Sequence, residues 1–419
     1  MNNREKLFNL VKRVVVEQKK TFLPSRISIG WPVFDHLEIT SALNTLLDLR
    51  ISQGLKTREF EEKFAEYIGT KYAVAVNSGT SANILAIATL IEAGDMKKGD
   101  EVILPATTFS SVASPILQLG LVPVYVDVDP TSWNINPAEI QKAISKKTRA
   151  IMVVHTFGNP ADMPEIMRIA KKYRLKVIED SCEAHGSRIG KRMCGSFGDI
   201  ITFSFYVAHN ITTGEGGMVL TNSQKYCDIL TSLRQFGRLP IRLVQSKDFI
   251  YKDSIIGKYN KQYVFCRLGY NVCMTDIAAS LGIEQLKKLD SFNQSRIKNV
   301  TSYNSALSKH AKYLRLPTVR QGAFHSFYGY PMVIEKNAPF RREELLQFLE
   351  SKSIENRPFF AGCLPDQPAF RSAPKRIVGK LPISRWIRDN GFFIGCHPGL
   401  SKEQIESVIS SFNSFLAKY

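Results

Sequence analysis

The stretch TFSFYVAHNITTGEGGMVLTN, residues 202–222, decides the fold. It begins and ends with apolar, β-rich runs, which predict two strands joined by a short crossover and a glycine turn. The crossover and its flanks carry small and hydrogen-bonding residues, namely Ser204, His209, Thr212, Glu215, Gly216 and Gly217. Such residues between two buried strands are typical of a strand-end site for a phosphorylated ligand.

Outward from this stretch, strand and helix patterns alternate between residues 72 and 222. The predicted strands are YAVAVNS (72–78), EVILPA (101–106), VPVYVDV (122–128), AIMVVHT (150–156), KVIED (176–180), DIITFSF (199–205) and GGMVLTN (216–222). The helical connections include SANILAIATLIEAG (81–94), PAEIQKAISKK (137–147) and MPEIMRIAKKYR (163–174). Near-continuous apolar strands with helical crossovers indicate an α/β fold whose sheet is mostly parallel and covered on both faces. Ligands of such sheets bind at the carboxyl ends of the strands.

The flanking segments complete a three-part division of the chain: an N-terminal segment (1–35), a large α/β domain (36–295) and a small C-terminal α+β domain (296–419). Helices are predicted from Asp35 to Leu49, from Thr57, and from Thr275 in TDIAASLGIEQLKKLDSF. The basic, polar stretch from residue 238 to 262 reads as a lid loop. In the last part, HSFYGYPMVIEK predicts a strand, RREELLQFLESKSI a helix, and Ser401 opens a closing helix.

Composition and charge narrow the class of protein. Apolar residues make up 44% and charged residues 22% of the chain, which is ordinary for a globular protein. No apolar run approaches the ~20 residues of a membrane span, and the basic start lacks the apolar core of a signal peptide. We therefore expect no membrane contact and a cytoplasmic location.

The net charge of +18 raises the possibility of nucleic-acid binding. The basic residues are scattered without a nucleic-acid motif, so a surface that attracts an anionic small ligand is the better account.

The cysteines predict free thiols rather than a metal site. The chain has seven, an odd number, and none forms a CxxC pair. Cys266 and Cys273 are separated by six residues, which is weak evidence for a metal. We predict none.

Four features lie at or shortly after predicted strand ends. The run Asn77–Asn83 follows a strand and opens a helix, where free N–H groups favour a phosphate, although a simple N-cap would look the same. Asp180 ends the KVIED strand and suits either a protonated ring nitrogen or a helix cap. Phe109, taken alone, reads as a core aromatic. His209 is a side chain that exchanges protons near neutral pH.

With these residues in place, the chain closely resembles the DegT/StrS-type sugar aminotransferases, which use pyridoxal 5'-phosphate (PLP). In that family a lysine six residues before the Glu-Gly-Gly bonds covalently to the cofactor; here that position is His209. The same exchange marks the branch of the nucleotide-sugar 3-dehydratases. The resemblance runs from about residue 30 to the end and includes the GYN-x-x-x-TD signature at 269–276. It implies the PLP-dependent transferase fold type I (aspartate aminotransferase-like), with a seven-stranded sheet.

The resemblance also implies roles for individual residues. His209 is the catalytic acid/base, and the cofactor contacts are Gly79, Thr80, Phe109, Asp180, Glu183, Ser204 and Asn271. Of these, Gly79, Thr80 and Ser204 would hold the phosphate, Phe109 would stack on the ring, and Glu183 would lie near O3′. Asn271 would reach the cofactor of a neighbouring subunit, which implies a homodimer with composite sites. Substrate contacts are expected from His185, Ser326, Phe327, Tyr328 and Arg357, although His185 reads equally well as a structural histidine.

The activity implied is removal of the C3 hydroxyl of a nucleoside-diphosphate 4-keto-6-deoxyhexose in deoxysugar and surface-polysaccharide biosynthesis. The working form of the cofactor would be pyridoxamine 5'-phosphate (PMP). Iron–sulfur relatives carry cluster cysteines before the GYN motif, and residues 228–265 contain none. PMP would therefore be regenerated with L-glutamate.

Three alternatives stay open: an aminotransferase with a lysine from elsewhere, a cluster- or reductase-dependent dehydratase, and an inactive binding protein. No lysine lies between Arg192 and Lys225.

Overall fold

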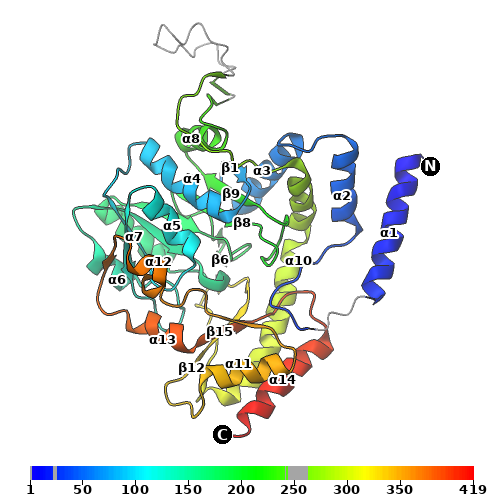
Figure 1. The fold of residues 1–419 in the computed structure, drawn as a ribbon, viewed down its shortest axis with the longest axis vertical. Helices are drawn as coiled ribbons and strands as arrows, with labels where there is room; N and C mark the ends of the chain where they lie inside the picture. The colour runs from blue at the N-terminus through cyan, green and yellow to red at the C-terminus, as the bar shows by residue number, and fades with distance from the viewer. Residues whose placement is uncertain (1, 22–25, 241, 244–262) are drawn as a thin grey trace.

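A large sheet flanked by helices, with a smaller sheet beside it, makes up the fold of this computed structural model (Figure 1). The structure describes residues 2–21, 26–240, 242–243 and 263–419. The predicted lid loop lies mostly outside the described residues.

The large sheet has eight strands in the order β1-β9-β8-β5-β4-β2-β3-β14. Their bounds are β1 Tyr72–Val76, β2 Glu101–Pro105, β3 Val122–Val126, β4 Thr148–Val154, β5 Lys176–Asp180, β8 Ile200–Ser204, β9 Gly217–Thr221 and β14 Arg376–Ile377. β9 pairs antiparallel with β1 and with β8, and the other pairings are parallel. The mostly parallel sheet is thus confirmed, with every predicted strand in place. The short edge strand β14 was not predicted.

Helices cover both faces of this sheet because its strands are apolar on both sides. They are α3 Leu55–Ile68, α4 Gly79–Glu92, α5 Ser110–Gln118, α6 Pro137–Ala143, α7 Met163–Tyr173 and α8 Gln224–Arg234. α3 begins two residues before the predicted start at Thr57. The buried carboxylate of Asp276 explains this, since it accepts hydrogen bonds from the N–H groups of Gly54 and Thr57 and from the Thr57 hydroxyl. A residue distant in sequence therefore caps the helix.

Helix α10, Asp276–Leu307, links the large sheet to the C-terminal part of the chain. The sequence predicts a helix that ends near Phe292, but the helix continues for four more turns. Its polar residues Asn293 and Arg296 are buried and hydrogen-bonded to other segments, so they do not interrupt it. The proposed division at residues 295–296 falls inside this helix and stays a proposal.

The C-terminal part contains a four-stranded antiparallel sheet in the order β10-β12-β15-β13. Its strands are β10 Leu314–Arg315, β12 Tyr330–Ile334, β13 Asn356–Pro358 and β15 Gly391–Ile394. α11 Arg342–Ser351 and α14 Lys402–Leu416 contribute to its hydrophobic core, as predicted for an α+β unit. A third sheet joins the two parts: β11 Ala323–Phe324 pairs with β6 Arg188–Ile189, which pairs with β7 Arg192–Met193.

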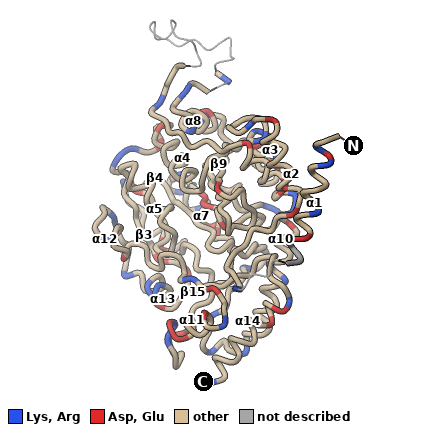
Figure 2. Tube along the Cα trace, turned by 45° about the vertical axis from the view of Figure 1, so that its right-hand side comes forward, with Lys and Arg blue, Asp and Glu red and all other residues tan. Residues whose placement is uncertain are grey.

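The remaining elements connect or flank these two parts. They are α1 Asn3–Thr21, α2 His36–Leu47, α12 Pro368–Arg371, α13 Pro382–Asn390 and the short 3₁₀ turns Thr156–Gly158, Ser308–His310 and Leu364–Asp366. Lysine and arginine are spread along the trace and alternate with acidic residues (Figure 2). None of the helices in the described part of the chain combines the length and apolar character that a membrane crossing requires.

Candidate active site

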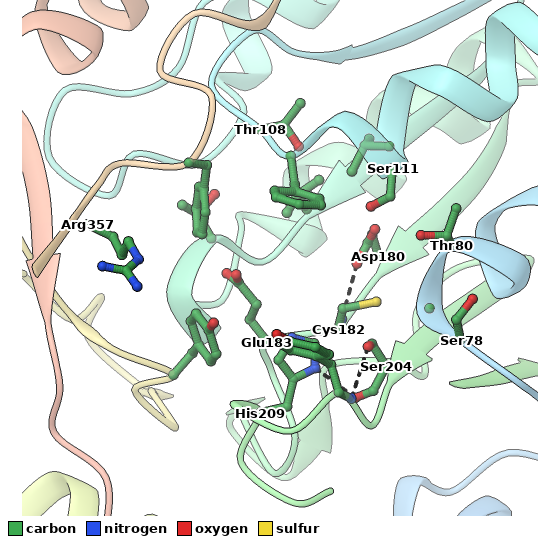
Figure 3. Close-up of a pocket in the computed structure, with 18 of the residues that line it drawn as sticks. Ser78, Thr80, Thr108, Ser111, Asp180, Cys182, Glu183, Ser204, His209 and Arg357 are labelled. Atoms are coloured by element: carbon green, nitrogen blue, oxygen red, sulfur yellow. Dashed lines mark hydrogen bonds between the residues drawn. The ribbon is translucent and has the colours of Figure 1, made fainter. Parts of the chain in front are cut away.

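A cavity of about 480 Å³ opens at the carboxyl ends of the central strands (Figure 3). The residues just after β1, β2, β4, β5 and β8 all contribute to it, and the C-terminal part supplies the opposite wall. Its lining is Ser78, Gly79, Thr80, Thr107, Thr108, Phe109, Ser111, Val112, Val154, Thr156, Asp180, Cys182, Glu183, Ser204, Tyr206, His209, Glu215, Tyr328, Arg357, Pro358, Phe360 and Phe393.

One end of the cavity is formed by the N-terminus of α4. The Ser78 hydroxyl caps this helix by accepting from the N–H of Ser81. The first-turn amides of Gly79 and Thr80 have no helical carbonyl to bond, so they are free to bind an anion. Ser204 packs so close that a Cβ on Gly79 would lie 2.5 Å from the Ser204 Cβ. Only glycine at position 79 therefore keeps this helix start, the phosphate cradle, open to an anion.

Asp180 occupies the floor at the end of β5. Its carboxylate accepts from the Asn83 side-chain amide at 2.9 Å and from the Cys182 N–H at 3.1 Å. Asn83 is fully buried and accepts in turn from the Thr202 hydroxyl at 2.7 Å. These bonds fix the orientation of the carboxyl group, which suits contact with the ring nitrogen of a bound cofactor.

Phe109 lies opposite this floor and precedes α5. Its side chain is 59% exposed, so it is not the core aromatic that its sequence context alone suggests. The structure therefore leaves Phe109 free to stack on a bound ring.

His209 lies in the crossover between β8 and β9. Its Nδ1 lies 2.8 Å from the carbonyl oxygen of Ser204. Because a carbonyl oxygen only accepts, Nδ1 carries the proton and Nε2 keeps a lone pair in the neutral ring. Burial lowers the pKa of His209 to about 4; the Ser204 carbonyl opposes this shift and the charge of Arg296 adds to it. His209 is a neutral base at physiological pH.

Glu183 and an aromatic wall face His209 across the cavity (Figure 3). Burial raises the pKa of the Glu183 carboxyl well above its usual range; the Phe157 N–H, which donates to it at 2.7 Å, opposes this shift and Asp180 adds to it. Burial therefore favours the protonated form of Glu183. The ring of Tyr328 contacts the ring of His209, with centroids 5.2 Å apart.

The cavity contains few cationic groups. Arg357, which also pairs with Glu355, is the arginine in its lining, and no lysine lines it among the described residues. In the part of the chain that the structure describes, no three histidine, cysteine or acidic side chains gather as a metal site. The predicted absence of an iron–sulfur cluster stays a prediction.

Most of the predicted site residues meet in this cavity, but four do not line it. His185 is fully buried behind His209, with ring centroids 6.0 Å apart, and it packs against Phe64, Phe203 and Phe205. Ser326 and Phe327 are buried in the turn that precedes Tyr328. Asn271 is exposed and pairs with Gln235 away from the cavity. Their predicted contacts with cofactor or substrate stay predictions.

Sequence reasoning also missed part of the lining. Thr107, Thr108 and Ser111 flank Phe109, and Cys182 lies between Asp180 and Glu183. Their closeness in sequence to predicted site residues could therefore have identified them as part of the lining. Phe360 and Phe393 carried no such signal, because the fold brings them from distant segments.

Comparison with known proteins identifies the family. The profile of the DegT/DnrJ/EryC1/StrS aminotransferase family matches residues 35–413. The chain belongs to this family. Among its DegT/DnrJ/EryC1/StrS relatives, a dTDP-4-dehydro-2,6-dideoxy-D-glucose 3-dehydratase from Saccharopolyspora spinosa is 38% identical over 396 residues, covering 92% of this chain and 86% of the relative. The lipopolysaccharide biosynthesis protein RfbH of Salmonella typhimurium is 36% identical over 428 residues, covering 99% and 98%.

A solved structure of the E. coli GDP-4-keto-6-deoxy-D-mannose 3-dehydratase with bound hydrated PLP superimposes with a TM-score of 0.85. It is 30% identical, and the match covers 92% of this chain and 98% of that one. This DegT/DnrJ/EryC1/StrS chain thus has the type I fold of PLP-dependent transferases, and its cofactor is PLP. The cavity fits that group: the glycine cradle at α4 suits a phosphate, Asp180 suits the ring nitrogen, and Phe109 is free to stack.

Proposed function

We propose that this chain is a PLP/PMP-dependent dehydratase that removes the C3 hydroxyl of a nucleoside-diphosphate 4-keto-6-deoxyhexose. The observation that carries the proposal is the histidine at position 209, in a cavity whose described lining contains no lysine. A sugar aminotransferase of this family needs a lysine amine there. An imidazole cannot replace it, but it can move a proton.

The position of each residue in the cavity suggests its role. Gly79, Thr80 and Ser204 would hold the cofactor phosphate, and Asp180 would hold the ring nitrogen. When bound, the amine form of the cofactor would supply an electron sink for the bond-breaking step in the sugar. His209 then takes a proton through Nε2, while the bond from Nδ1 to Ser204 keeps the ring in the correct tautomer.

The leaving hydroxyl also needs a proton. His209 gains one when it acts as a base, and because its pKa is about 4 the charged ring is a strong acid. We propose that it protonates the C3 oxygen, which leaves as water. The raised pKa of Glu183 favours its protonated form, which would limit the negative charge in this part of the cavity. Arg357 at the opening would bind an anionic part of the nucleotide-sugar.

The amine donor supplies the electrons that removal of the sugar oxygen requires. The sugar loses one oxygen, and L-glutamate is oxidised to 2-oxoglutarate with release of ammonia. Similarity to 3-dehydratases of nucleotide-sugars supports this reaction class. We further propose that the enzyme acts in the cytoplasm in deoxysugar synthesis for surface polysaccharide, and that it is a homodimer in which Asn271 reaches the partner's phosphate site.

The test is incubation of the purified protein with PLP, L-glutamate and GDP-4-keto-6-deoxymannose, followed by mass spectrometry of the nucleotide-sugar. Loss of one oxygen, with ammonia and 2-oxoglutarate in equal amounts, is expected. A product that carries nitrogen would contradict the dehydratase assignment and restore an aminotransferase. Conversion of PLP to PMP with no sugar change would point to a different nucleotide-sugar. No change of either kind would favour the inactive or cluster-dependent alternatives.

A further inference from the structure

Arg296, in the middle of α10, places a guanidinium in the interior next to the active site. The residue is only 2% exposed. The ionisable side chains that act on it are Cys396 and Tyr328, and burial raises the pKa of both, so both are neutral. His185, His209 and His397 also face it, and burial lowers the pKa of each. Holding a positive charge among neutral buried groups costs free energy, so hydrogen bonds from the guanidinium must offset this cost.

Those hydrogen bonds go to one turn of the chain. Nη1 of Arg296 donates to the carbonyl oxygen of Phe327 at 3.1 Å and to that of Tyr328 at 2.9 Å. Phe327 has φ +49°, a left-handed conformation that a bulky side chain rarely adopts. The Cys396 thiol also donates to the Phe327 carbonyl, at 3.4 Å. The strained turn is therefore held from outside, and Arg296 bonds both of its carbonyls at residues 327 and 328.

The turn is connected to two titratable residues of the cavity, His209 and Glu183. The Tyr328 ring lies edge-on against His209. The Tyr328 N–H donates to the Phe157 carbonyl at 2.9 Å, and the Phe157 N–H donates to the Glu183 carboxyl at 2.7 Å. A shift of the turn would displace the imidazole on one side and the carboxyl on the other.

A second side chain of α10 fixes the other flank of His209. Asn293, one helical turn before Arg296, accepts from the side-chain amide of Asn210 at 2.9 Å and donates to the His185 carbonyl at 2.8 Å. Asn210 directly follows His209 and also donates to the Ser326 carbonyl at 3.1 Å. One face of α10 thus contacts the histidine segment and the turn opposite it.

We propose that Arg296 is a positioning residue of the active site, which fixes the 327–328 turn so that the Tyr328 ring holds the His209 imidazole in place. The consequence for turnover rests on the proposed function. The consequence for the imidazole does not, since it concerns the geometry and charge around one ring.

Two substitutions test the role of the guanidinium. Arg296→Met keeps only the aliphatic part of the side chain and removes the charge and the donors together, whereas Arg296→Lys keeps a charged donor. Arg342→Met is the matched control: Nη1 of Arg342 also donates to two main-chain carbonyls, those of Arg388 at 2.7 Å and Gly391 at 3.3 Å, away from His209. It should cost stability without affecting the active site.

The readout is NMR of ring-labelled histidines in the full-length protein. The chain has seven histidines, and His209→Asn assigns the resonance of His209. The wild-type resonance should not titrate between about pH 5 and 8, where an ordinary histidine does. In Arg296→Met it should shift and begin to titrate in that range; in Arg296→Lys the change should be smaller, and in Arg342→Met absent.

The dehydratase assay gives the second readout. Arg296→Met should lower kcat about 10²-fold with little change in KM, which is the effect of a displaced catalytic group, and Arg296→Lys should recover part of it. If Arg296→Met only lowers Tm, like Arg342→Met, and leaves both the His209 resonance and kcat unchanged, Arg296 is merely structural and the proposal is wrong. A wild-type protein that converts no sugar would contradict the proposed function, while the NMR comparison would still decide the role of Arg296.

Discussion

The rings of Tyr328 and His209 meet edge-on, with an interplanar angle of 90° and centroids 5.2 Å apart. His209 belongs to the crossover of the large sheet, and Tyr328 lies two residues before β12 of the small one. An edge-on contact with an aromatic ring restricts rotation of the imidazole. The geometry of the base therefore depends on how the C-terminal part packs against the large sheet.

Replacing Tyr328 tests this dependence. Tyr328→Ala removes the ring and should lower kcat about 10²-fold, because the imidazole loses its fixed orientation. Tyr328→Phe keeps the ring and should retain most of the activity. Single-turnover conversion of the nucleotide-sugar, followed by mass spectrometry, measures both. An equal loss in the two variants would show that the hydroxyl matters and that ring packing does not.

Replacing His209 tests the identity of the base. His209→Asn retains polarity but cannot accept the proton, so kcat should fall by about 10²–10⁴-fold while PLP still binds. His209→Lys places an amine where this family's aminotransferases have one. Borohydride treatment of that variant with PLP should add the mass of the cofactor to the protein, and the wild type should gain nothing. Mass gained by the wild type would show that another lysine reaches the cofactor.

The strands of the large sheet could be predicted because each is a short run of β-branched and apolar residues bounded by turn signals. The phosphate cradle, Asp180 and His209 could be predicted for a related reason: each lies within a few residues of such a run. In a parallel sheet the carboxyl ends meet at one edge. Local sequence patterns therefore predicted the half of the site that lies at the strand ends of the large sheet.

The other half depends on tertiary contacts that a sequence pattern does not contain. Phe360 and Phe393 enter the wall only because the small sheet packs against the large one. Ser326 and Phe327 adjoin Tyr328 in sequence, yet the turn buries both of them and presents only Tyr328 to the cavity. His185, the other ambiguous case, supports His209 from behind, which agrees with the structural alternative.

Removing the charge of Asp180 tests the ring-nitrogen contact. Asp180→Asn keeps the shape and much of the bonding to Asn83 and Cys182, but it loses the negative charge. Turnover should fall on the order of 10²-fold, the usual effect of losing one fixed electrostatic contact in an active site. Asp127→Asn is the matched control, since Asp127 is also buried but caps α13 at Ile383 and Ser384. It should lower Tm and leave PLP affinity, measured by absorbance titration, unchanged. Equal effects of both substitutions on PLP affinity would contradict the contact.

Replacing Glu183 tests its buried, protonated state through stability. Its pKa is raised in the folded protein by burial, and in the unfolded chain it is about 4.3. Above that value the unfolded chain releases the proton and the folded protein keeps it, so this group destabilises the fold increasingly as the pH rises toward the folded pKa. Glu183→Gln removes the penalty. The free energy of unfolding in urea, measured on the cofactor-free protein, should therefore exceed that of the wild type at pH 7–8, and the difference should shrink toward pH 4. Glu215→Gln, at an exposed position in the same lining, is the control and should change little at any pH. A Glu183→Gln variant that is less stable than the wild type at pH 8 would show that the carboxyl is ionised in the folded protein, and Glu183 would then be a second negative charge beside Asp180.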